Sequence, residues 1–381
     1  MLLKTAELFA GPGGGAYAAK TTHLEDESNE SWGFQHAWAN EIDPDTVATY
    51  KENILDDPDA KTVFCEDVRQ FDFSDHKLLS DIDALIFGFP CNDFSLVGKQ
   101  KGLTGSYGPL YTYGIKALEE FQPSVFIAEN VGGLSSANEG EAFIQVTSAM
   151  IHAGYFITPH FFKFEQYGVP QTRHRIIIVG IRDDLHNKGL VYRVPEPTTP
   201  NPDDFVTSEE ALTDPPIPAD ATNNEATRHS ERTEKMLSYI PEGGNAWSLS
   251  IPEKYRLKVK GAKLSNIYKR LDRHKPSYTV TGSGGGGTHM YHWSENRALT
   301  NRERARLQTF PDSFHFVGGK ESVRRQIGMA IPPRGMHYIL KAVLNTFAGI
   351  EYPSIRPTPK LQPGTLNKIS GSEIASLVKL S

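Results

Sequence analysis

The stretch LLKTAELFAGPGGGAYAAK, from Leu2 to Lys20, joins an apolar run to a turn with four glycines and then to a segment rich in alanine. The apolar run predicts a strand, and the alanine-rich segment predicts a helix. Glycines between a strand and a helix let the backbone approach a ligand at the positively polarised helix N-terminus. The stretch therefore predicts the first strand–turn–helix unit of an α/β domain, with a site for an adenosine-like ligand at the turn. A tight turn without a ligand is the alternative.

The same alternation continues through the first 190 residues. Segments with helical spacing separate the apolar runs. The strand-like runs are residues 34–42, 61–68, 82–90, 124–131 and 175–182, and the helical segments are 43–54, 111–121 and 140–155. Near-continuous apolar strands separated by helices are typical of a parallel sheet covered on both faces. We therefore predict an α/β fold with a doubly wound, mixed but mostly parallel sheet, and a smaller second domain.

The composition limits the class of protein. The chain has 381 residues, a formal net charge of -6 and two cysteines. No apolar run reaches the roughly 18 residues of a membrane span, and the N-terminus lacks the regions of a secretory signal peptide. Cys65 and Cys91 are too few for a disulfide framework and lack the spacing of metal ligands. We expect a cytoplasmic protein with reduced cysteines, no membrane association and no metal.

A change of composition marks a domain boundary near residue 195. Residues 195–218 are rich in Pro, Asp and Thr, and a basic segment, residues 254–275, follows them. An uneven charge distribution can give an acidic protein an electropositive face for a polyanion; a solvated, lysine-rich surface is the alternative. We predict a large domain from residues 1–190 and 291–350, a small domain from 191–290, and a C-terminal tail from 351–381.

Several polar residues stand where the predicted strands end. They are Glu41, Asp67, Cys91 and Glu129 at carboxyl ends, with Arg173 and Arg175 at alternate positions beside the last run. Ligands of open α/β sheets bind outside the carboxyl ends of the strands. A thiol, a carboxylic acid and a guanidinium at one sheet edge can attack a ring, protonate its nitrogen and hold its carbonyl. Taken singly, a buried structural cysteine, a helix cap and a surface arginine pair are the alternatives.

An ordered series of motifs resembles the DNA (cytosine-5) methyltransferases of bacterial restriction-modification systems. The series is ELFAGPGG, NEID, EDV, GFPCNDFS, GPLY, ENVGGL, YGVPQTRHR, LTNRERARLQTFPD and GMAIPPRG, and the resemblance covers residues 4 to about 347. It implies a large, Rossmann-like lobe that binds S-adenosylmethionine, a small target-recognition lobe, and double-stranded DNA between them. It also implies that the target base is flipped out of the duplex. We expect a monomer, with a cognate restriction endonuclease that acts on the same DNA site.

The resemblance also implies roles for individual residues. Those expected to line the methyl-donor pocket are Phe9, Gly11, Gly13, Glu41, Asp67, Pro90 and Leu110. Cys91 would add to C6 of a cytosine, which makes C5 nucleophilic enough to accept a methyl group. Glu129 would bond or protonate N3 and Arg175 would bind O2, with Arg173 in the same catalytic set. The basic residues of 254–275 would neutralise DNA phosphates.

Four positions depart from the usual pattern of that family. Asn92 stands in place of Gln, Glu7 in place of Asp, and Met329 in place of Asn, and Pro12 lies within the glycine turn. Other functions also remain open, namely an RNA cytosine-5 methyltransferase, a catalytically silent DNA-binding relative and a nicotinamide-dependent oxidoreductase. The long second region favours DNA, because sequence readout along a duplex needs a second lobe. The intact Cys91, Glu129, Arg173 and Arg175 favour an active methyltransferase.

Overall fold

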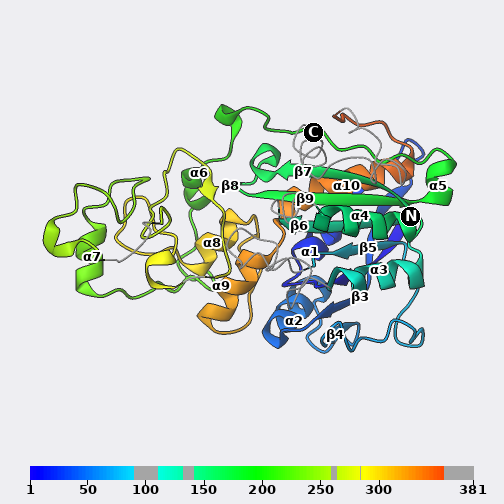
Figure 1. Cartoon of the computed structure of the whole chain (residues 1–381), viewed down its shortest axis with the longest axis horizontal. Helices are drawn as coiled ribbons and strands as arrows, with labels where there is room; N and C mark the ends of the chain where they lie inside the picture. Colours follow the sequence, from blue (N-terminus) through cyan, green and yellow to red (C-terminus); the bar gives the residue numbers. More distant parts are fainter. Residues whose placement is uncertain (90–109, 132–140, 259–263, 284, 356–381) are drawn as a thin grey trace. The chain divides into compact units, whose positions relative to one another are not determined.

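The computed structural model of the chain describes residues 1–89, 110–131, 141–258, 264–283 and 285–355 (Figure 1). The contacts within the chain divide it into two compact units. The first unit is Met1–Lys163, His174–Pro197 and Met336–Ser381, and the second is Phe164–Arg173 and Thr198–Gly335. Within the described ranges, no helix is long and apolar enough to cross a membrane.

The first unit is built on one sheet with the strand order β2-β3-β1-β5-β6-β9-β7, and β4 pairs with β3. Its strands are β1 (Leu2–Leu8), β2 (His23–Glu25), β3 (Ser31–Glu41), β4 (Val63–Cys65), β5 (Ala84–Phe87), β6 (Val125–Val131), β7 (Tyr155–Lys163) and β9 (His174–Arg182). The central pairs β1–β3, β1–β5 and β5–β6 are parallel, whereas β9 is antiparallel to both β6 and β7. This arrangement confirms the predicted mixed, mostly parallel sheet.

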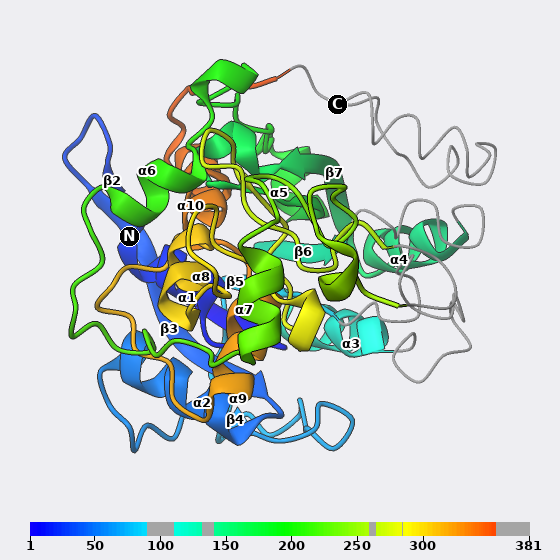
Figure 2. The same ribbon diagram turned by 90° about the vertical axis from the view of Figure 1, so that its left-hand side faces the viewer.

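Helices cover both faces of this sheet (Figures 1 and 2). They are α1 (Gly14–Thr21), α2 (Pro44–Tyr50) with the π-helix η1 (Lys51–Leu55), α3 (Tyr111–Phe121), α4 (Glu141–His152), α5 (Asp183–Asn187) and α10 (Pro333–Ala348). The hydroxyl of Thr22, directly after α1, lies 2.7 Å from Nδ1 of His337 in α10, which joins these two helices. Apolar side chains such as Trp38, Phe87 and Phe126 are fully buried and form the core of the unit. Their burial provides most of the stabilisation.

The sequence did not predict β7, whose segment contains Pro159. A proline cannot donate a hydrogen bond to a neighbouring strand, and it is therefore confined to sheet edges and bulges. β7 is the last strand in the sheet order, and it pairs only with β9 among the strands of the unit. The edge position explains why a strand forms here despite the proline.

The second unit contains little regular structure. Its elements are η6 (Phe164–Tyr167), β8 (Gln171–Thr172), η7 (Pro202–Asp204), α6 (Ser208–Thr213), α7 (Glu231–Leu237), η8 (Glu253–Tyr255), β10 (Ser277–Tyr278), η9 (Gly286–Thr288), α8 (Asn301–Leu307) and α9 (Lys320–Met329). Buried arginines connect its loops. Arg302 is fully buried and donates to the carbonyls of Thr222, Pro311 and Phe314 at 3.0, 3.0 and 2.7 Å. These bonds satisfy backbone groups that no strand ladder satisfies.

The expected domain boundaries differ from this division. We assigned residues 291–350 to the large domain, but residues 291–335 belong to the second unit and only 336–350 to the first. The contacts of Arg302 with residue 222 explain part of the difference, since they tie α8 to the loops that precede it. Residues 164–173 also belong to the second unit, because β8 pairs with β10.

Candidate active site

The glycine turn after β1 has the backbone shape that the sequence predicts. Phe9, Gly11 and Gly13 have φ angles of 54°, 57° and 94°, in the left-handed region that glycine adopts most easily. A Cβ atom on Gly13 would lie 2.8 Å from Cγ1 of Ile54, so a larger residue cannot occupy this position without displacing the η1 segment. The turn leads directly into the N-terminus of α1, where Gly13 is the N-cap. Backbone N–H groups are therefore available to a ligand at this helix end.

Glu41, at the end of β3, ties the turn to the neighbouring strand. Its carboxylate accepts the Gly11 N–H at 2.9 Å and the N–H groups of Ile42 and Asp43 at 2.9 and 3.1 Å. Burial raises the pKa of Glu41, and the three N–H donors partly offset this rise. A carboxylate held beside a glycine turn can accept further hydrogen bonds from ribose hydroxyls. The donor set therefore fits an adenosine-containing ligand such as S-adenosylmethionine.

The other residues expected in the donor pocket lie in different surroundings. Asp67 follows β4 and pairs with Arg69, whose Nε lies 3.0 Å from both carboxylate oxygens. These hydrogen bonds lower the pKa of Asp67, so its carboxylate is already engaged within the protein. Leu110 directly precedes α3 and packs on the core of the first unit. Pro90 lies outside the described residues.

Glu129 and Arg175 form an ion pair in the first unit. Glu129 is in β6 and Arg175 in the adjacent strand β9, and Arg175 Nε lies 2.7 Å from Glu129 Oε1. Their side chains are 14% and 13% exposed, so most of the pair is withdrawn from water while its edge stays accessible. The pair supplies a carboxyl group and a guanidinium at the carboxyl end of β6, as expected from the sequence.

The same end of β6 also contacts the segment that leads to the predicted nucleophile. A Cβ atom on Gly88, after β5, would lie 3.3 Å from Glu129 Oε2, which places this carboxyl group against the Gly88 backbone. Asn130 Nδ2 donates to the Phe89 carbonyl at 3.4 Å. Cys91 and Asn92 lie outside the described residues. The sequence did not predict the contact of Asn130, although its place after Glu129 in the ENV motif was a visible signal.

Arg173 lies in surroundings that the sequence did not predict. Its side chain is fully buried in the second unit, and its Nη atoms donate to the carbonyls of Val280, Gly328 and Ala330 at 3.1, 3.2 and 3.0 Å. The predicted alternation with Arg175 assumed one continuous strand, whereas Arg173 lies between β8 and β9. The structure thus places Arg173 among backbone segments that it holds together, and its catalytic assignment stays a prediction.

The basic segment 254–275 is only partly available to an anion. Arg270 is buried and donates to the carbonyls of His292 and Leu237 at 2.8 and 2.7 Å, which corrects the expectation that it neutralises phosphate. Arg273 pairs with Glu242 at 3.1 Å. Lys254 and Lys258 are exposed and remain candidates for phosphate contacts, whereas Lys260 and Lys263 lie outside the described residues.

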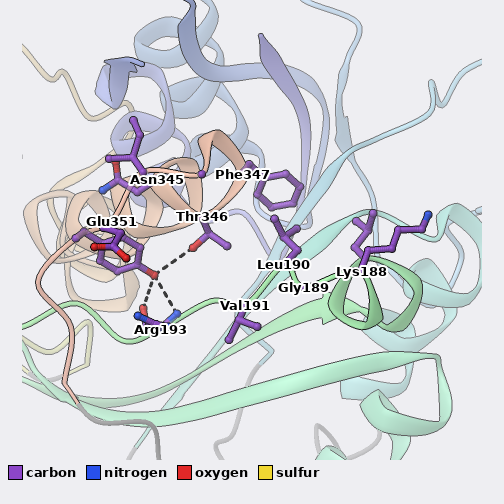
Figure 3. A pocket seen from close by; sticks show the side chains of 13 residues that line it. Lys188, Gly189, Leu190, Val191, Arg193, Asn345, Thr346, Phe347 and Glu351 are labelled. Carbon is purple, nitrogen blue, oxygen red and sulfur yellow. Dashed lines mark hydrogen bonds between the residues drawn. The ribbon is translucent and has the colours of Figure 1, made fainter. Parts of the chain in front are cut away.

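A pocket of about 580 Å³ lies between the segment after α5 and the end of α10 (Figure 3). The Tyr352 hydroxyl donates to the Arg193 carbonyl at 2.8 Å and accepts the Arg193 N–H at 2.9 Å. Residues 351–355 are therefore anchored to the first unit. Residues 356–381 lie outside the described residues, and the C-terminal tail stays a prediction. Arg175 lies near the start of β9, at the carboxyl end of the antiparallel strand β6. The pocket follows the other end of β9, and it therefore lies at the opposite ends of the strands. We do not assign this pocket to the candidate site.

Within the described part of the chain, no group of three or more His, Cys, Asp or Glu side chains is placed to hold a metal ion.

Comparison with known proteins identifies relatives along almost the whole chain. The sequence model of the C-5 cytosine-specific DNA methylases matches residues 3–345. The type II methyltransferase M.BbvI of Brevibacillus brevis is 57% identical over 361 residues, which are 93% of this chain and 94% of the relative. The type II methyltransferase M.NgoFVII of Neisseria gonorrhoeae is 41% identical over 321 residues, 83% and 82% of the two chains.

Solved structures share the fold at low sequence identity. The crystal structure of a prophage-encoded protein of E. coli has a TM-score of 0.62 and 24% identity, and covers 91% of this chain and 99% of its own. The S. pombe Dnmt2 methyltransferase has a TM-score of 0.55 and 16% identity, with 91% and 98% coverage. At these identities the similarity concerns the fold alone.

Proposed function

This chain belongs to the family of C-5 cytosine-specific DNA methylases, and on that premise we propose how it methylates a cytosine within a specific DNA sequence. The observation that carries the proposal is the Glu129–Arg175 ion pair, which lies beside Gly88 at the start of the segment that contains Cys91. The glycine turn and Glu41 supply a second set of groups in the same unit, suited to the methyl donor.

Glu41, Gly11 and Gly13 would hold S-adenosylmethionine, together with Phe9, Asp67, Pro90 and Leu110. The donor supplies a methyl group activated on a sulfonium sulfur. The Glu41 carboxylate would accept from the ribose hydroxyls, and the left-handed backbone at Gly11 and Gly13 would let the ligand approach the N-terminus of α1 closely. For Asp67 to accept from the adenine, its pair with Arg69 would have to open or share the carboxylate.

Cys91 would act as the nucleophile. The thiolate forms a bond to C6 of the cytosine, and the electron pair displaced from the C5–C6 bond makes C5 nucleophilic. Glu129 would donate a proton or hydrogen bond to N3, and Arg175 would bind O2, so both stabilise the charge that develops on the ring. After C5 has gained the methyl group, a base removes the C5 proton, and the S–C6 bond breaks to release Cys91.

DNA recognition would fall to the second unit. A stacked base blocks the approach of a thiolate to C6, so the target must leave the duplex. Exposed lysines such as Lys254 and Lys258 would neutralise phosphates. The type II names of the relatives support a place in a restriction-modification system, with a cognate endonuclease that cuts the same site. We further propose that the enzyme works as a monomer in the cytoplasm.

The test of the proposed function is bisulfite sequencing of DNA after the chain is expressed in a host that has no other cytosine methyltransferase. We expect one cytosine of a single short motif to be fully methylated and therefore to resist conversion to uracil by bisulfite. The same host RNA, sequenced in the same way, is the control for an RNA substrate. Protection confined to RNA, or no protection in either nucleic acid, would contradict the proposal.

Replacement of Glu41 by alanine should weaken binding of S-adenosylmethionine. The variant loses the acceptor for the Gly11 N–H, which is 2.9 Å away, as well as the expected ribose contacts. Losing two or three hydrogen bonds to a charged group predicts a loss of about 3 kcal/mol, or on the order of 100-fold in Kd. Isothermal titration measures this change, and an unchanged Kd would remove Glu41 from the donor site.

A further inference from the structure

A small cavity lies behind the glycine turn, enclosed by residues of β1, β3, α1, α2 and η1. Its volume is about 140 Å³, and its polar lining includes Thr5, Glu7, His36 and Tyr50. Roughly 15 Å³ in this measure is enough for one water molecule. The cavity is therefore large enough to hold water next to the side chains that contact the glycine turn, and it has no part in the proposed donor contacts.

Glu7 is the chemically unusual member of this lining. Its side chain is 3% exposed, and both carboxyl oxygens are buried beside the Tyr50 hydroxyl. Burial raises the pKa of Glu7 to about 8, with the Tyr50 hydroxyl opposing the rise. A buried carboxyl group in such surroundings keeps its proton. At pH 7 Glu7 is accordingly an uncharged acid.

Glu7 lies directly against the first turn of α1. A Cβ atom on Gly15 would be only 2.7 Å from Glu7 Oε1, so the carboxyl group packs on the Gly15 backbone. Tyr50 packs on the glycine turn in a similar way, because a Cβ atom on Gly13 would lie 3.1 Å from the Cδ2 atom of Tyr50. The position of the glycine turn thus depends on the side chains that line the cavity.

Glu7 is the titratable side chain of the cavity lining whose protonation state changes near pH 8. Lys20, from α1, is engaged with Asp56 at 2.6 Å. Burial lowers the pKa of His36, on β3, to about 4, so this side chain is neutral. The pKa of Tyr50, from α2, lies well above its ordinary value because of burial and the neighbouring Glu7. Between pH 7 and 9.5, then, Glu7 is the lining group expected to ionise.

We propose that Glu7 is a positioning residue for the methyl donor, which as an uncharged acid keeps the first turn of α1 and the glycine turn in the shape that binds S-adenosylmethionine. The proposal rests on the assignment of the glycine turn to the donor site. An ionised carboxylate cannot stay desolvated, so loss of the proton draws water into the cavity and displaces the backbone that packs on it. Donor affinity should then fall as Glu7 ionises.

The experiment is titration of the full-length chain with S-adenosylmethionine from pH 6.5 to 9.5. For a pKa of about 8, the protonated fraction falls about thirtyfold between pH 7 and 9.5, which sets the largest loss of affinity. We expect a loss of at least about fivefold in the native chain and a nearly flat profile in Glu7→Gln, which keeps the shape without the charge. Glu25→Gln, an exposed position on β2, is the matched control and should follow the native profile.

A second ligand separates positioning from charge attraction. S-adenosylhomocysteine lacks the positive sulfonium, so a displaced turn should weaken both ligands equally, whereas a direct charge interaction should affect only the cationic donor. A profile of Glu7→Gln that matches the native chain, an effect on one ligand alone, or a rise in affinity with pH would each overturn the proposal. Failure of the native chain to bind the donor at pH 7 would instead contradict the proposed function.

The contact with Gly15 provides an independent test at constant pH. Gly15→Ala places a methyl group on the Glu7 carboxyl and should weaken donor binding on the order of tenfold, while Glu7→Ala in the same chain should restore part of the affinity. Additive effects of the two changes would show that the two residues do not act together, and would contradict the proposed contact.

Discussion

Methyl transfer to DNA should fall by at least about 10⁴-fold when Cys91 is replaced by serine, the scale on which enzymes lose activity with their nucleophile. The reason is chemical. A thiol with a pKa of about 8.5 supplies a thiolate near neutral pH, whereas a serine hydroxyl supplies almost no alkoxide without a dedicated base. Without the bond to C6, C5 of cytosine remains too weak a nucleophile to take the methyl group. Transfer of a labelled methyl group to a duplex that carries the target motif measures the loss.

The second cysteine provides the matched control for this experiment. Cys65 ends β4, where its Sγ lies 3.7 Å from the Ile42 carbonyl, and partial burial with the nearby Glu41 carboxyl raises its pKa. Cys65→Ser should therefore transfer methyl groups at the native rate. Binding of the target duplex should be retained in both variants, since neither change removes a phosphate contact. A Cys91→Ser variant that keeps a tenth or more of the native rate would exclude the covalent mechanism.

The second large effect is expected at the Glu129–Arg175 ion pair. Arg175→Ala should slow single-turnover methyl transfer by about 100- to 1,000-fold, the range found when one stabilising donor of a developing charge is removed. The change also leaves the Glu129 carboxyl, 14% exposed, without its partner. Loss of one member of a largely buried pair predicts a destabilisation of about 3 kcal/mol. Rapid-quench kinetics and thermal unfolding measure the two effects separately.

Two further measurements make this result specific. Donor affinity of Arg175→Ala should stay within about twofold of the native value, since the donor groups lie elsewhere in the unit. Asp184→Asn breaks an exposed ion pair with Arg182 at the other end of β9 and should leave the rate unchanged. An equal loss of rate and donor affinity in Arg175→Ala would place this residue at the donor and contradict its assignment to the base.

Much of the first unit could be predicted from the sequence because its strands are buried on both faces. β5 and the first four residues of β6 are continuous apolar runs, and such runs have few other ways to be buried. The edge strand β7 lacks this signal, since Pro159 interrupts it. The position of Arg173 also could not be predicted, because alternation in the sequence does not reveal where a strand breaks.

The fold of the second unit was harder to predict from the sequence. Its loops are joined by buried arginines such as Arg270 and Arg302, whose partners are backbone carbonyls distant in the chain. Side chain–carbonyl bonds of this kind have no sequence period, so neither the fold of the unit nor its true boundaries could be read directly. In the site, the glycine turn and Glu41 were predicted, whereas the cavity behind Glu7 depends on three-dimensional packing that residue order does not express.

The passage of residues 164–173 into the second unit has a consequence for the exchange of DNA specificity between relatives. Gln171 Oε1 accepts the Val280 N–H at 2.7 Å, and its Nε2 donates to the Leu307 carbonyl at 3.1 Å. A hybrid that received only residues 198–335 from another enzyme would keep the native segment 164–173. Gln171 in that segment would then face foreign loops in place of its own partners. On the proposed assignment of DNA recognition to the second unit, specificity would be inherited in two pieces, and recombination at a single pair of crossover points would separate residues that contact one another.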